Sequence, residues 1–330
     1  MPQITFVLYE DCLSSAVTSL IDAFSICNAL REETKSKGNR CKTSSSLFEM
    51  KIAAATREPV LTNGGVWVQP EAALESIDGS DLILIPPRLY ARQPKDEELA
   101  HIIPWLIKSY RKGGRIGAMC TGSFVLASTG LLDGKIATTN WLFMKKFQRQ
   151  FPRVILKPER ILTEDEGLIC SGAMTAMYNL ALYVIEIFVS DELSRRCSKI
   201  MLVDHKRKSQ LPYMATTFRK NHGDEQILNA QHWFEDNYAG QFTIDDVANV
   251  VGLSPRHFKR RFKQVTGESP LRYVQQIRLE MAKTMLETSL ENIEIITHEV
   301  GYEDSRTFRR LFKQYTSLSP REYRVRFSVI

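Results

Sequence analysis

An internal repeat in the last third of the chain restricts the fold more than any other feature of the sequence. The segment FKRRFKQVTGESPLRY (258–273) aligns with FRRLFKQYTSLSPREY (308–323) at an offset of 50 residues, and nine of the 16 aligned pairs are identical. The identical pairs are Phe258/Phe308, Arg260/Arg310, Phe262/Phe312, Lys263/Lys313, Gln264/Gln314, Thr266/Thr316, Ser269/Ser319, Pro270/Pro320 and Tyr273/Tyr323. Self-similarity at a fixed offset predicts two copies of one structural unit.

Each copy has the same plan: a short helix, a turn that contains glycine, and a second, basic helix. The expected elements are Ile244–Val250, Gly252 and Pro255–Thr266 in the first copy, and Ile293–Val300, Gly301 and Ser305–Thr316 in the second. Each glycine falls where the chain needs a positive φ after a helix. This plan predicts two helix-turn-helix units, with no strand in this part of the chain.

Both second helices are expected to be apolar on one face and basic on the other. The apolar residues recur at i, i+4 and i+7: Phe258, Phe262, Val265 and Phe308, Phe312, Tyr315. The remaining surface carries no acid and these cations: Arg256, Lys259, Arg260, Arg261, Lys263, and Arg306, Arg309, Arg310, Lys313. A solvated cationic face would explain one such helix, but two copies favour a polyanion partner. Residues 205–330 hold 20 Lys and Arg against 15 Asp and Glu, which accounts for +5 of the net charge of +6.

The stretch GYEDSRTFRRLFKQYTSLSPREYR (301–324) is very similar to the signature of the AraC/XylS family of transcription regulators. The resemblance covers about residues 222–327. It implies an all-α domain of seven helices, in which Leu271–Glu287 links two recognition helices that enter successive major grooves of double-stranded DNA, about 34 Å apart. By position, we expect base contacts from Arg256, Lys259, Arg260, Ser305, Arg306 and Arg310. We expect phosphate contacts from Lys263, Arg309 and Lys313.

Before the repeat, strand-like and helix-like segments alternate, which is typical of an α/β domain with a parallel sheet between helices, as in flavodoxin-like and PfpI-like folds. The expected strands are Ile4–Leu8, Phe48–Ala55, Leu82–Ile85, Arg115–Ala118 and a hairpin of Ile161–Thr163 with Leu168–Cys170. The expected helices are Ser14–Leu30, Glu97–Lys112 and an apolar one within Ala173–Ser190. The last of these is short for a membrane span and contains Asn179 and Glu186, so we expect a buried helix.

Cysteine and histidine give no sign of a metal site or of a cofactor. The six cysteines, Cys12, Cys27, Cys41, Cys120, Cys170 and Cys197, form no CxxC pair, and the histidines form no HxH or HxxxH pair. In a chain of this size we expect free thiols. The N-terminus lacks the features of a signal peptide, so we expect a cytoplasmic protein that associates with the nucleoid and not with a membrane.

Cys120 stands in a context typical of a nucleophile. The segment RIGAMCTG (115–122) is a strand that runs into A-x-C-x-G and then into an apolar helix, Ser123–Thr129. Small residues on both sides let the turn close tightly, and the start of the following helix would lower the pKa of the thiol. A buried structural cysteine is the equally simple alternative.

Together with GLLDGKIATTNW (130–141), this stretch resembles the PfpI branch of the class I glutamine-amidotransferase-like superfamily over residues 4 to about 200. The two resemblances combine into the GlxA-type arrangement. The superfamily places a histidine where this chain has Asn140, and an acid near Ala16, where none stands; Asp22 is further along the helix. We therefore expect no catalysis, and a pocket for a small effector lined by Tyr9, Glu10, Cys120, Thr121, Asn140 and Trp141. An amino acid or a quaternary amine is the effector that the resemblance implies.

The domain organisation expected from these patterns is an effector-binding and dimerisation domain (1–204), a linker (205–221) and a DNA-binding domain (222–330). The chain is thus expected to be a ligand-responsive transcription regulator, and an activator by resemblance, acting as a homodimer with RNA polymerase. Two alternatives stay open at this point. One is a Cys120-dependent hydrolase or hydratase with an accessory DNA-binding tail, and the other is a constitutive DNA-binding protein whose first domain only dimerises.

Overall fold

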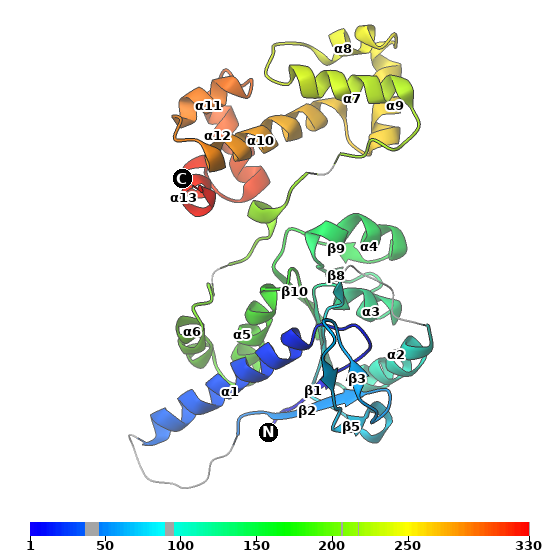
Figure 1. Cartoon of the computed structure of the whole chain (residues 1–330), viewed down its shortest axis with the longest axis vertical. Coiled ribbons are helices and arrows are strands. Elements are labelled where there is room, and N and C mark those ends of the chain that lie inside the picture. The colour runs from blue at the N-terminus through cyan, green and yellow to red at the C-terminus, as the bar shows by residue number, and fades with distance from the viewer. Residues whose placement is uncertain (37–45, 90–95, 206, 217, 330) are drawn as a thin grey trace. The chain divides into compact units, whose positions relative to one another are not determined.

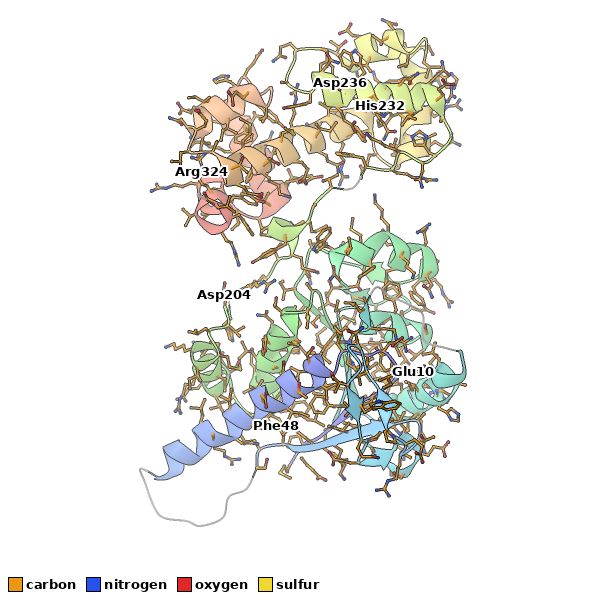
Figure 2. All side chains as sticks on the ribbon, viewed as in Figure 1. Glu10, Phe48, Asp204, His232, Asp236 and Arg324 are labelled. Atoms are coloured by element: carbon orange, nitrogen blue, oxygen red, sulfur yellow. The ribbon has the colours of Figure 1, made fainter. Side chains whose placement is uncertain are left out.

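The computed structural model describes residues 1–36, 46–89, 96–205, 207–216 and 218–329. Cys41 lies outside the described residues. The chain divides into two compact units, Met1–Gln210 and Leu211–Ile330, so the division falls inside the segment 205–221 (Figure 1). The first unit has one hydrophobic core and the second unit has two, and side chains fill the interior of both units (Figure 2).

The first unit is built on a seven-stranded sheet in the order β10-β11-β7-β6-β1-β2-β5. Its strands are β1 (Gln3–Val7), β2 (Glu49–Ala54), β5 (Ala72–Ala73), β6 (Leu82–Ile85), β7 (Arg115–Met119), β10 (Leu162–Asp165) and β11 (Leu168–Ser171). All neighbours are parallel except the hairpin β10–β11 at one edge. This confirms the α/β fold class expected from the sequence. The strand β5 was not predicted, because two alanines carry no strand pattern.

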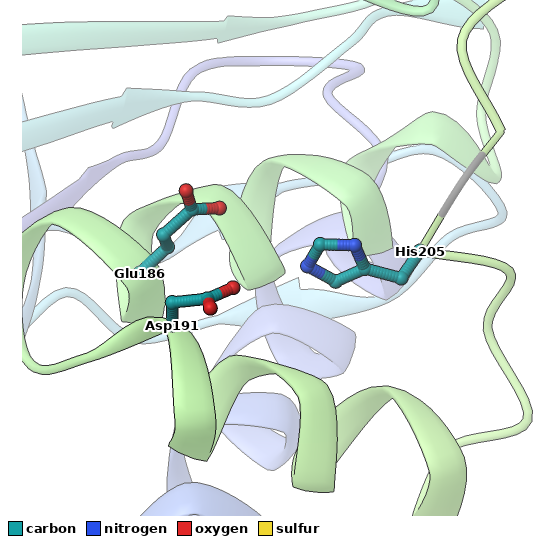
Figure 3. Close-up of side chains that lie close together, drawn as sticks. All are labelled: Glu186, Asp191 and His205. Atoms are coloured by element: carbon teal, nitrogen blue, oxygen red, sulfur yellow. The ribbon is translucent and has the colours of Figure 1, made fainter.

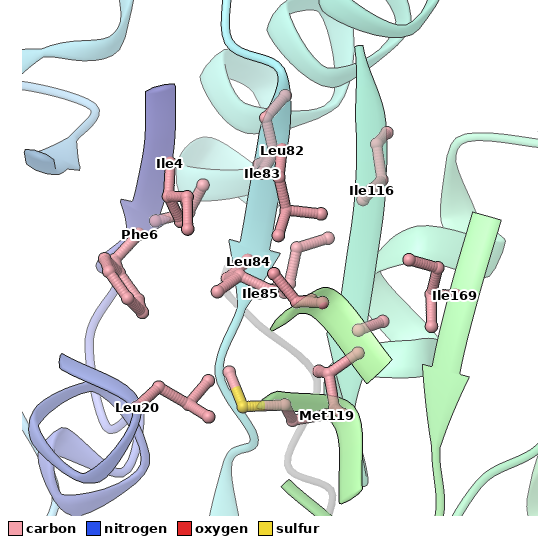
Figure 4. Close-up of a cluster of buried hydrophobic side chains, with 14 of the residues drawn as sticks. Ile4, Phe6, Leu20, Leu82, Ile83, Leu84, Ile85, Ile116, Met119 and Ile169 are labelled. Atoms are coloured by element: carbon pink, nitrogen blue, oxygen red, sulfur yellow. The ribbon is translucent and has the colours of Figure 1, made fainter. Parts of the chain in front are cut away.

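The α-helices of this unit are α1 (Ser14–Ser36), α2 (Asp96–Arg111), α3 (Gly122–Ser128), α4 (Met144–Gln150), α5 (Ala176–Phe188) and α6 (Asp191–Ile200). Helix α5 packs on one face of the sheet, and α2 and α3 pack on the other (Figure 1). Helix α5 packs on α1, α6 and β11, while α2 packs on α3 and β7. Residues 82–85 are completely buried, which agrees with a strand covered on both faces. Figure 4 shows these side chains with those of β1, β7 and β11 and with Leu20 of α1. Two small sheets, β3–β4 (Val60–Leu61, Trp67–Val68) and β8–β9 (Ile136–Ala137, Ile155–Leu156), lie outside the main sheet.

The second unit has seven α-helices and no strand among its described residues. The helices are α7 (Glu225–Asn237), α8 (Ile244–Val250), α9 (Pro255–Thr266), α10 (Pro270–Thr288), α11 (Ile293–Glu299), α12 (Ser305–Thr316) and α13 (Pro320–Phe327). A short 3₁₀ helix, η4 (Leu211–Tyr213), precedes them. The helices form two cores, one around α7–α9 and one around α11–α13. The first half of α10 belongs to the first core and the second half to the other, so α10 joins two small bundles (Figure 1).

Candidate functional site

The repeat folds into two equivalent helix-turn-helix units. In the first, α8 ends at the turn of Gly252, whose φ is 69°, and the N–H of Leu253 donates to the carbonyl of Ala248 at 2.9 Å. In the second, Gly301 has a φ of 87°, and the N–H of Tyr302 donates to the carbonyl of Thr297 at 3.0 Å. These left-handed conformations confirm the predicted role of the two glycines.

The second helix of each unit is amphipathic in the expected sense. Phe258 and Phe262 of α9 are completely buried, as are Phe308 and Phe312 of α12. The predicted DNA-contacting cations are all exposed: Arg256, Lys259, Arg260, Lys263, Arg306, Arg309, Arg310 and Lys313. Ser305, the first residue of α12, is partly buried. The apolar faces therefore anchor the two helices and leave their basic faces to solvent.

Arg261 does not belong to this basic face, which corrects the sequence analysis. Its Nε and a terminal nitrogen donate to the two carboxylate oxygens of Asp224, at 2.6 and 3.0 Å, and the other terminal nitrogen donates to Gln226 at 2.7 Å. Asp224 is the N-cap of α7. Arg261 thus ties α9 to α7 inside the unit. Lys259 also has an acidic neighbour, Asp245 of α8, at 2.7 Å, but both of these side chains are about half exposed.

In the first unit, Cys120 stands at a sharp turn between β7 and α3. Its φ is 52°, which is rare for a residue with a side chain. Its N–H donates to the carbonyl of Ser171 at 2.8 Å, and its own carbonyl accepts from the hydroxyls of Ser123 and Thr139, at 2.8 and 3.1 Å. The strained backbone is therefore held on both sides, as in a nucleophile elbow.

Burial of Cys120 opposes the lowering of its thiol pKa that the following helix was expected to cause. Cys120 is buried, and burial raises the pKa of its thiol; hydrogen bonds from Asn140 and from the N–H of Thr121 oppose this effect without cancelling it. The side chain of Asn140 also accepts a hydrogen bond from the N–H of Leu142 at 3.0 Å, so it is fixed as the cap of the turn η3 (Trp141–Phe143). The side chain beside the thiol is therefore an amide, which cannot take its proton.

Arg88 is a residue of this site that the sequence analysis missed. It is buried, its guanidinium lies over the ring of Tyr9 at 5.1 Å from the centroid, and it donates to the carbonyl of Glu10. Its backbone exchanges hydrogen bonds with the hydroxyl of Thr121, at 2.8 and 2.6 Å. The signal was its place three residues after the end of β6, because the carboxyl ends of neighbouring parallel strands meet at one edge of a sheet.

Tyr9 and Glu10 also line a cleft of ≈ 440 Å³ at the carboxyl ends of β1 and β2. The remaining walls come from β2, the β3–β4 hairpin and α2, and include Thr56, Glu58 and Trp67. Trp67 is 65% exposed. Among the described residues, the tryptophan that lines this cleft is therefore Trp67, whereas Trp141 lies on η3 and is only partly buried.

One group of side chains has donors that could suit a metal ion. Oxygen or nitrogen atoms of Glu186, Asp191 and His205 lie within 4.8 Å of one another at the junction of α5 and α6 (Figure 3). The three residues are exposed, and Asp191 also pairs with Arg195 one turn further along α6. Asp191 therefore already has a cationic partner, and exposed acidic groups commonly lie this close together without a metal ion. No helix within the described ranges is both long and apolar enough to cross a membrane.

Comparison with known proteins agrees with this division of the chain. The DJ-1/PfpI family matches residues 18–187, and a helix-turn-helix domain matches residues 247–326. The HTH-type transcriptional regulator GbdR of Pseudomonas aeruginosa is 27% identical over 268 residues, which are 80% of this chain and 71% of GbdR. GlxA of Rhizobium meliloti, also an HTH-type transcriptional regulator, is 28% identical over 219 residues, 66% of this chain and 67% of GlxA. RhaS of an Enterobacter strain, an HTH-type transcriptional activator, is 37% identical over 101 residues, 31% of this chain and 36% of RhaS.

Two crystal structures resemble the chain in fold. A transcriptional regulator protein of Vibrio parahaemolyticus superposes with a TM-score of 0.52 at 20% identity, over 61% of this chain and 98% of that one. An AraC family regulator of Pseudomonas putida superposes with a TM-score of 0.50 at 18% identity, over 61% of this chain and all of that one.

The first unit is an α/β domain with a nucleophile elbow, and two linked helix-turn-helix units follow it. This combination defines an AraC-type transcription regulator of the GlxA arrangement. The chain belongs to the DJ-1/PfpI family.

Proposed function

We propose that this regulator reads DNA with α9 and α12 in successive major grooves. The observation that carries the proposal is the pair of basic faces, each opposite two buried phenylalanines and both set on the shared helix α10. Side chains near the start of each recognition helix would meet base edges, where arginine can pair with both acceptors of guanine. In this proposal the base-reading residues are Arg256, Lys259, Arg260, Ser305, Arg306 and Arg310. The phosphate-binding residues are Lys263, Arg309 and Lys313.

The test is the selection of bound fragments from a random duplex pool by the full-length protein at near-physiological salt. Two conserved blocks about ten base pairs apart are the expected result. Arg260→Ala and Arg310→Ala should each relax the preference at one base position, while Lys263→Ala should weaken binding to all sequences alike and flatten its salt dependence. The control is Lys199→Ala, which removes an exposed lysine of α6 and should change neither the base preference nor the salt dependence. Sequence-blind binding by the full chain and by residues 222–330 alone would refute the proposal.

For the first unit we propose the binding of a small effector, an amino acid or a quaternary amine, near the elbow and the adjoining cleft. The rings of Tyr9 and Trp67 and the carboxylates of Glu10 and Glu58 suit a cationic group. The guanidinium of Arg88 suits a carboxylate. Cys120, Thr121, Asn140 and Trp141 complete the proposed set.

Calorimetric titration with amino acids and quaternary amines tests the effector class. We expect heat from at least one of these compounds, and a loss of affinity of about tenfold or more in Trp67→Ala, because a cation would lose an aromatic face. Ile155→Ala, which truncates an exposed apolar side chain of β9 outside the proposed set, is the control and should keep the affinity. Heat from simple anions alone would contradict the proposal.

We further propose that the first unit is not an enzyme, since Asn140 stands where a base is needed and the Cys120 thiol is held protonated. The rival is a Cys120-dependent hydrolase or hydratase. Cys120→Ala separates the two: a regulator keeps its DNA binding and has no turnover to lose, whereas an enzyme loses a measurable turnover.

The proposed organisation is an effector-binding and dimerisation domain (1–204), a linker (205–221) and a DNA-binding domain (222–330). We propose a homodimer that acts in the cytoplasm, at the nucleoid, as an activator together with RNA polymerase; RhaS, a relative of the C-terminal third, is named an activator. The effector would act by binding the DNA-competent and DNA-incompetent states with different affinities. DNA affinity that does not change with any effector would favour the constitutive alternative.

A further inference from the structure

Reading two grooves at once requires that the two recognition helices keep a fixed distance and orientation. Helix α10 is the covalent link between the two bundles, and it contributes Tyr273 to the first core and Leu286 to the second. A single helix sets the separation along its own axis. It does not by itself stop the two bundles from tilting about that axis, because each bundle is packed around a different half of it. Direct contacts between the two bundles, outside α10, must therefore fix their relative orientation.

Arg278 lies at the middle of α10 and reaches the loop between α7 and α8. Its Nε donates to the carbonyl of Tyr238 at 2.7 Å, and a terminal nitrogen donates to the carbonyl of Gly240 at 3.0 Å. The guanidinium carbon is 5.9 Å from the ring centroid of Phe242. All three partners belong to the first bundle, where Tyr238 and Phe242 pack on its core.

The same guanidinium touches the turn of the second bundle. Its carbon lies 5.4 Å from the ring centroid of Tyr302, a residue of the second core. A Cβ placed on Gly301 would lie 3.0 Å from the guanidinium carbon and 2.8 Å from the carbonyl oxygen of Ala239. The turn before α12 is therefore in direct contact with both Arg278 and the loop before α8.

We propose that Arg278 is a positioning residue for DNA recognition, which locks the α7–α8 loop of the first bundle to the Gly301 turn of the second and so sets the spacing of DNA blocks that the protein accepts. The inference rests on the proposed reading of DNA by both α9 and α12. A planar guanidinium can donate to two carbonyls and stack on rings at once, whereas the ammonium of lysine cannot do both. Arg278→Lys is thus expected to behave like a loss of function.

The experiment measures affinity of the full-length protein for duplexes that carry the two selected blocks at their natural spacing, or one and two base pairs closer or further apart. Each base pair moves one block along and around the duplex, so the wild type should lose about tenfold or more in affinity for each altered spacing. In Arg278→Ala and Arg278→Lys, we expect the spacings to differ by no more than about twofold to threefold, since the bundles can then adjust.

Two further variants separate positioning from folding. Arg278→Met keeps an unbranched side chain against the Tyr302 ring but makes no hydrogen bond, and it should lose the spacing preference while its circular dichroism stays that of the wild type. Arg272→Ala removes an exposed arginine from the same helix and should keep the preference. A wild-type spacing profile in the Arg278 variants, even at lower affinity, would overturn the inference while the proposed function stands. A wild type that binds all spacings equally would overturn both.

Discussion

Gly122 shows how closely the elbow is built around its backbone. A Cβ at this position would lie 2.7 Å from the carbonyl oxygen of Ile85 and 2.8 Å from that of Pro86, at the end of β6. Backbone atoms of a central strand cannot move aside as a flexible side chain can. The glycine therefore lets the start of α3 approach β6, and this approach brings Thr121 to Arg88.

We expect Gly122→Ala to lower the free energy of unfolding of the first unit by about 1–3 kcal/mol, because the added methyl group forces the elbow away from β6. Gly79→Ala is the matched control, since its Cβ would meet no atom within 4 Å and its φ is not positive. That change should stay within about 0.5 kcal/mol of the wild type. Urea unfolding of the three proteins measures the effect, and equal midpoints for Gly122→Ala and the wild type would contradict it.

At the residue scale, the sequence predicted where Cys120 lies in the fold better than it predicted the pKa of its thiol. The spacing of small residues around Cys120 was enough to predict the turn between strand and helix. It could not predict that burial would raise the pKa of the thiol, because residues from other parts of the chain, such as Ser171 and Thr139, hold the backbone of Cys120 in place. Arg88 was missed for the same reason: its neighbours Tyr9 and Thr121 are 79 and 33 positions away in the sequence.

At the scale of elements, an ion pair between α7 and α9 adds to the apolar contacts that hold the first recognition helix. The side chain of Asp224 is 12% exposed and that of Arg261 is 31% exposed. Burial by itself would raise the pKa of Asp224, but the hydrogen bonds from Arg261 and from the N–H of Ile227, with the charge of Arg261, outweigh it and lower that pKa. In the second copy Leu311 occupies the position of Arg261, so this pair belongs to the first bundle alone.

A carboxylate whose pKa is lowered by folding stabilises the protein above its unfolded pKa of about 3.9, and the effect disappears as the pH falls through the folded pKa. We therefore expect Asp224→Asn to cost about 1–3 kcal/mol of unfolding free energy at pH 7, because it leaves Arg261 without its anionic partner. The difference from the wild type should shrink as the pH falls below about 4. Asp236→Asn, at an exposed position of the same helix (Figure 2), should have almost no effect at either pH. Urea unfolding at several pH values measures this, and a difference that grows with acid would refute it.

Helix boundaries in the second unit were predictable because local signals mark them. Pro255 begins α9 and Asp304 caps α12 through the N–H groups of Arg306 and Thr307, and the predicted bounds of both helices are the observed ones. Contacts between helices were not predictable. Arg261 counted as one more cation of a basic face, since nothing in its own helix indicates a partner 37 residues earlier.

At the scale of the whole molecule, the boundary between the two units lies between Gln210 and Leu211. Gln210 ends the first unit almost completely buried, and its amide nitrogen donates to the carbonyls of Thr139, Pro158 and Arg160 at 2.9–3.0 Å. The next residues, Leu211–Tyr213, form η4, which packs on α12 within the second unit.

Thr139 connects Gln210 to the turn of Cys120. Its hydroxyl donates to the carbonyl of Cys120 at 3.1 Å, while its own carbonyl accepts from Gln210 at 3.0 Å. A compound that displaced Cys120 or Asn140 would therefore disturb the residue that holds the end of the first unit. A coupling of this kind needs two arrangements of the connecting segment, which both sites favour to different degrees.

Gln210→Ala should uncouple the two units without disabling either. The variant loses its hydrogen bonds to three carbonyls, so we expect amide exchange over residues 207–216 to become about tenfold faster while residues 255–266 exchange as in the wild type. DNA affinity without effector should stay within about twofold, and the change in that affinity caused by the compound that gives heat in calorimetry should disappear. Lys208→Ala, which removes an exposed side chain two residues earlier, should alter none of these quantities. If the variant exchanges faster and yet responds fully to the effector, the signal does not pass through Gln210, and the contacts of Thr139 serve only the stability of the first unit.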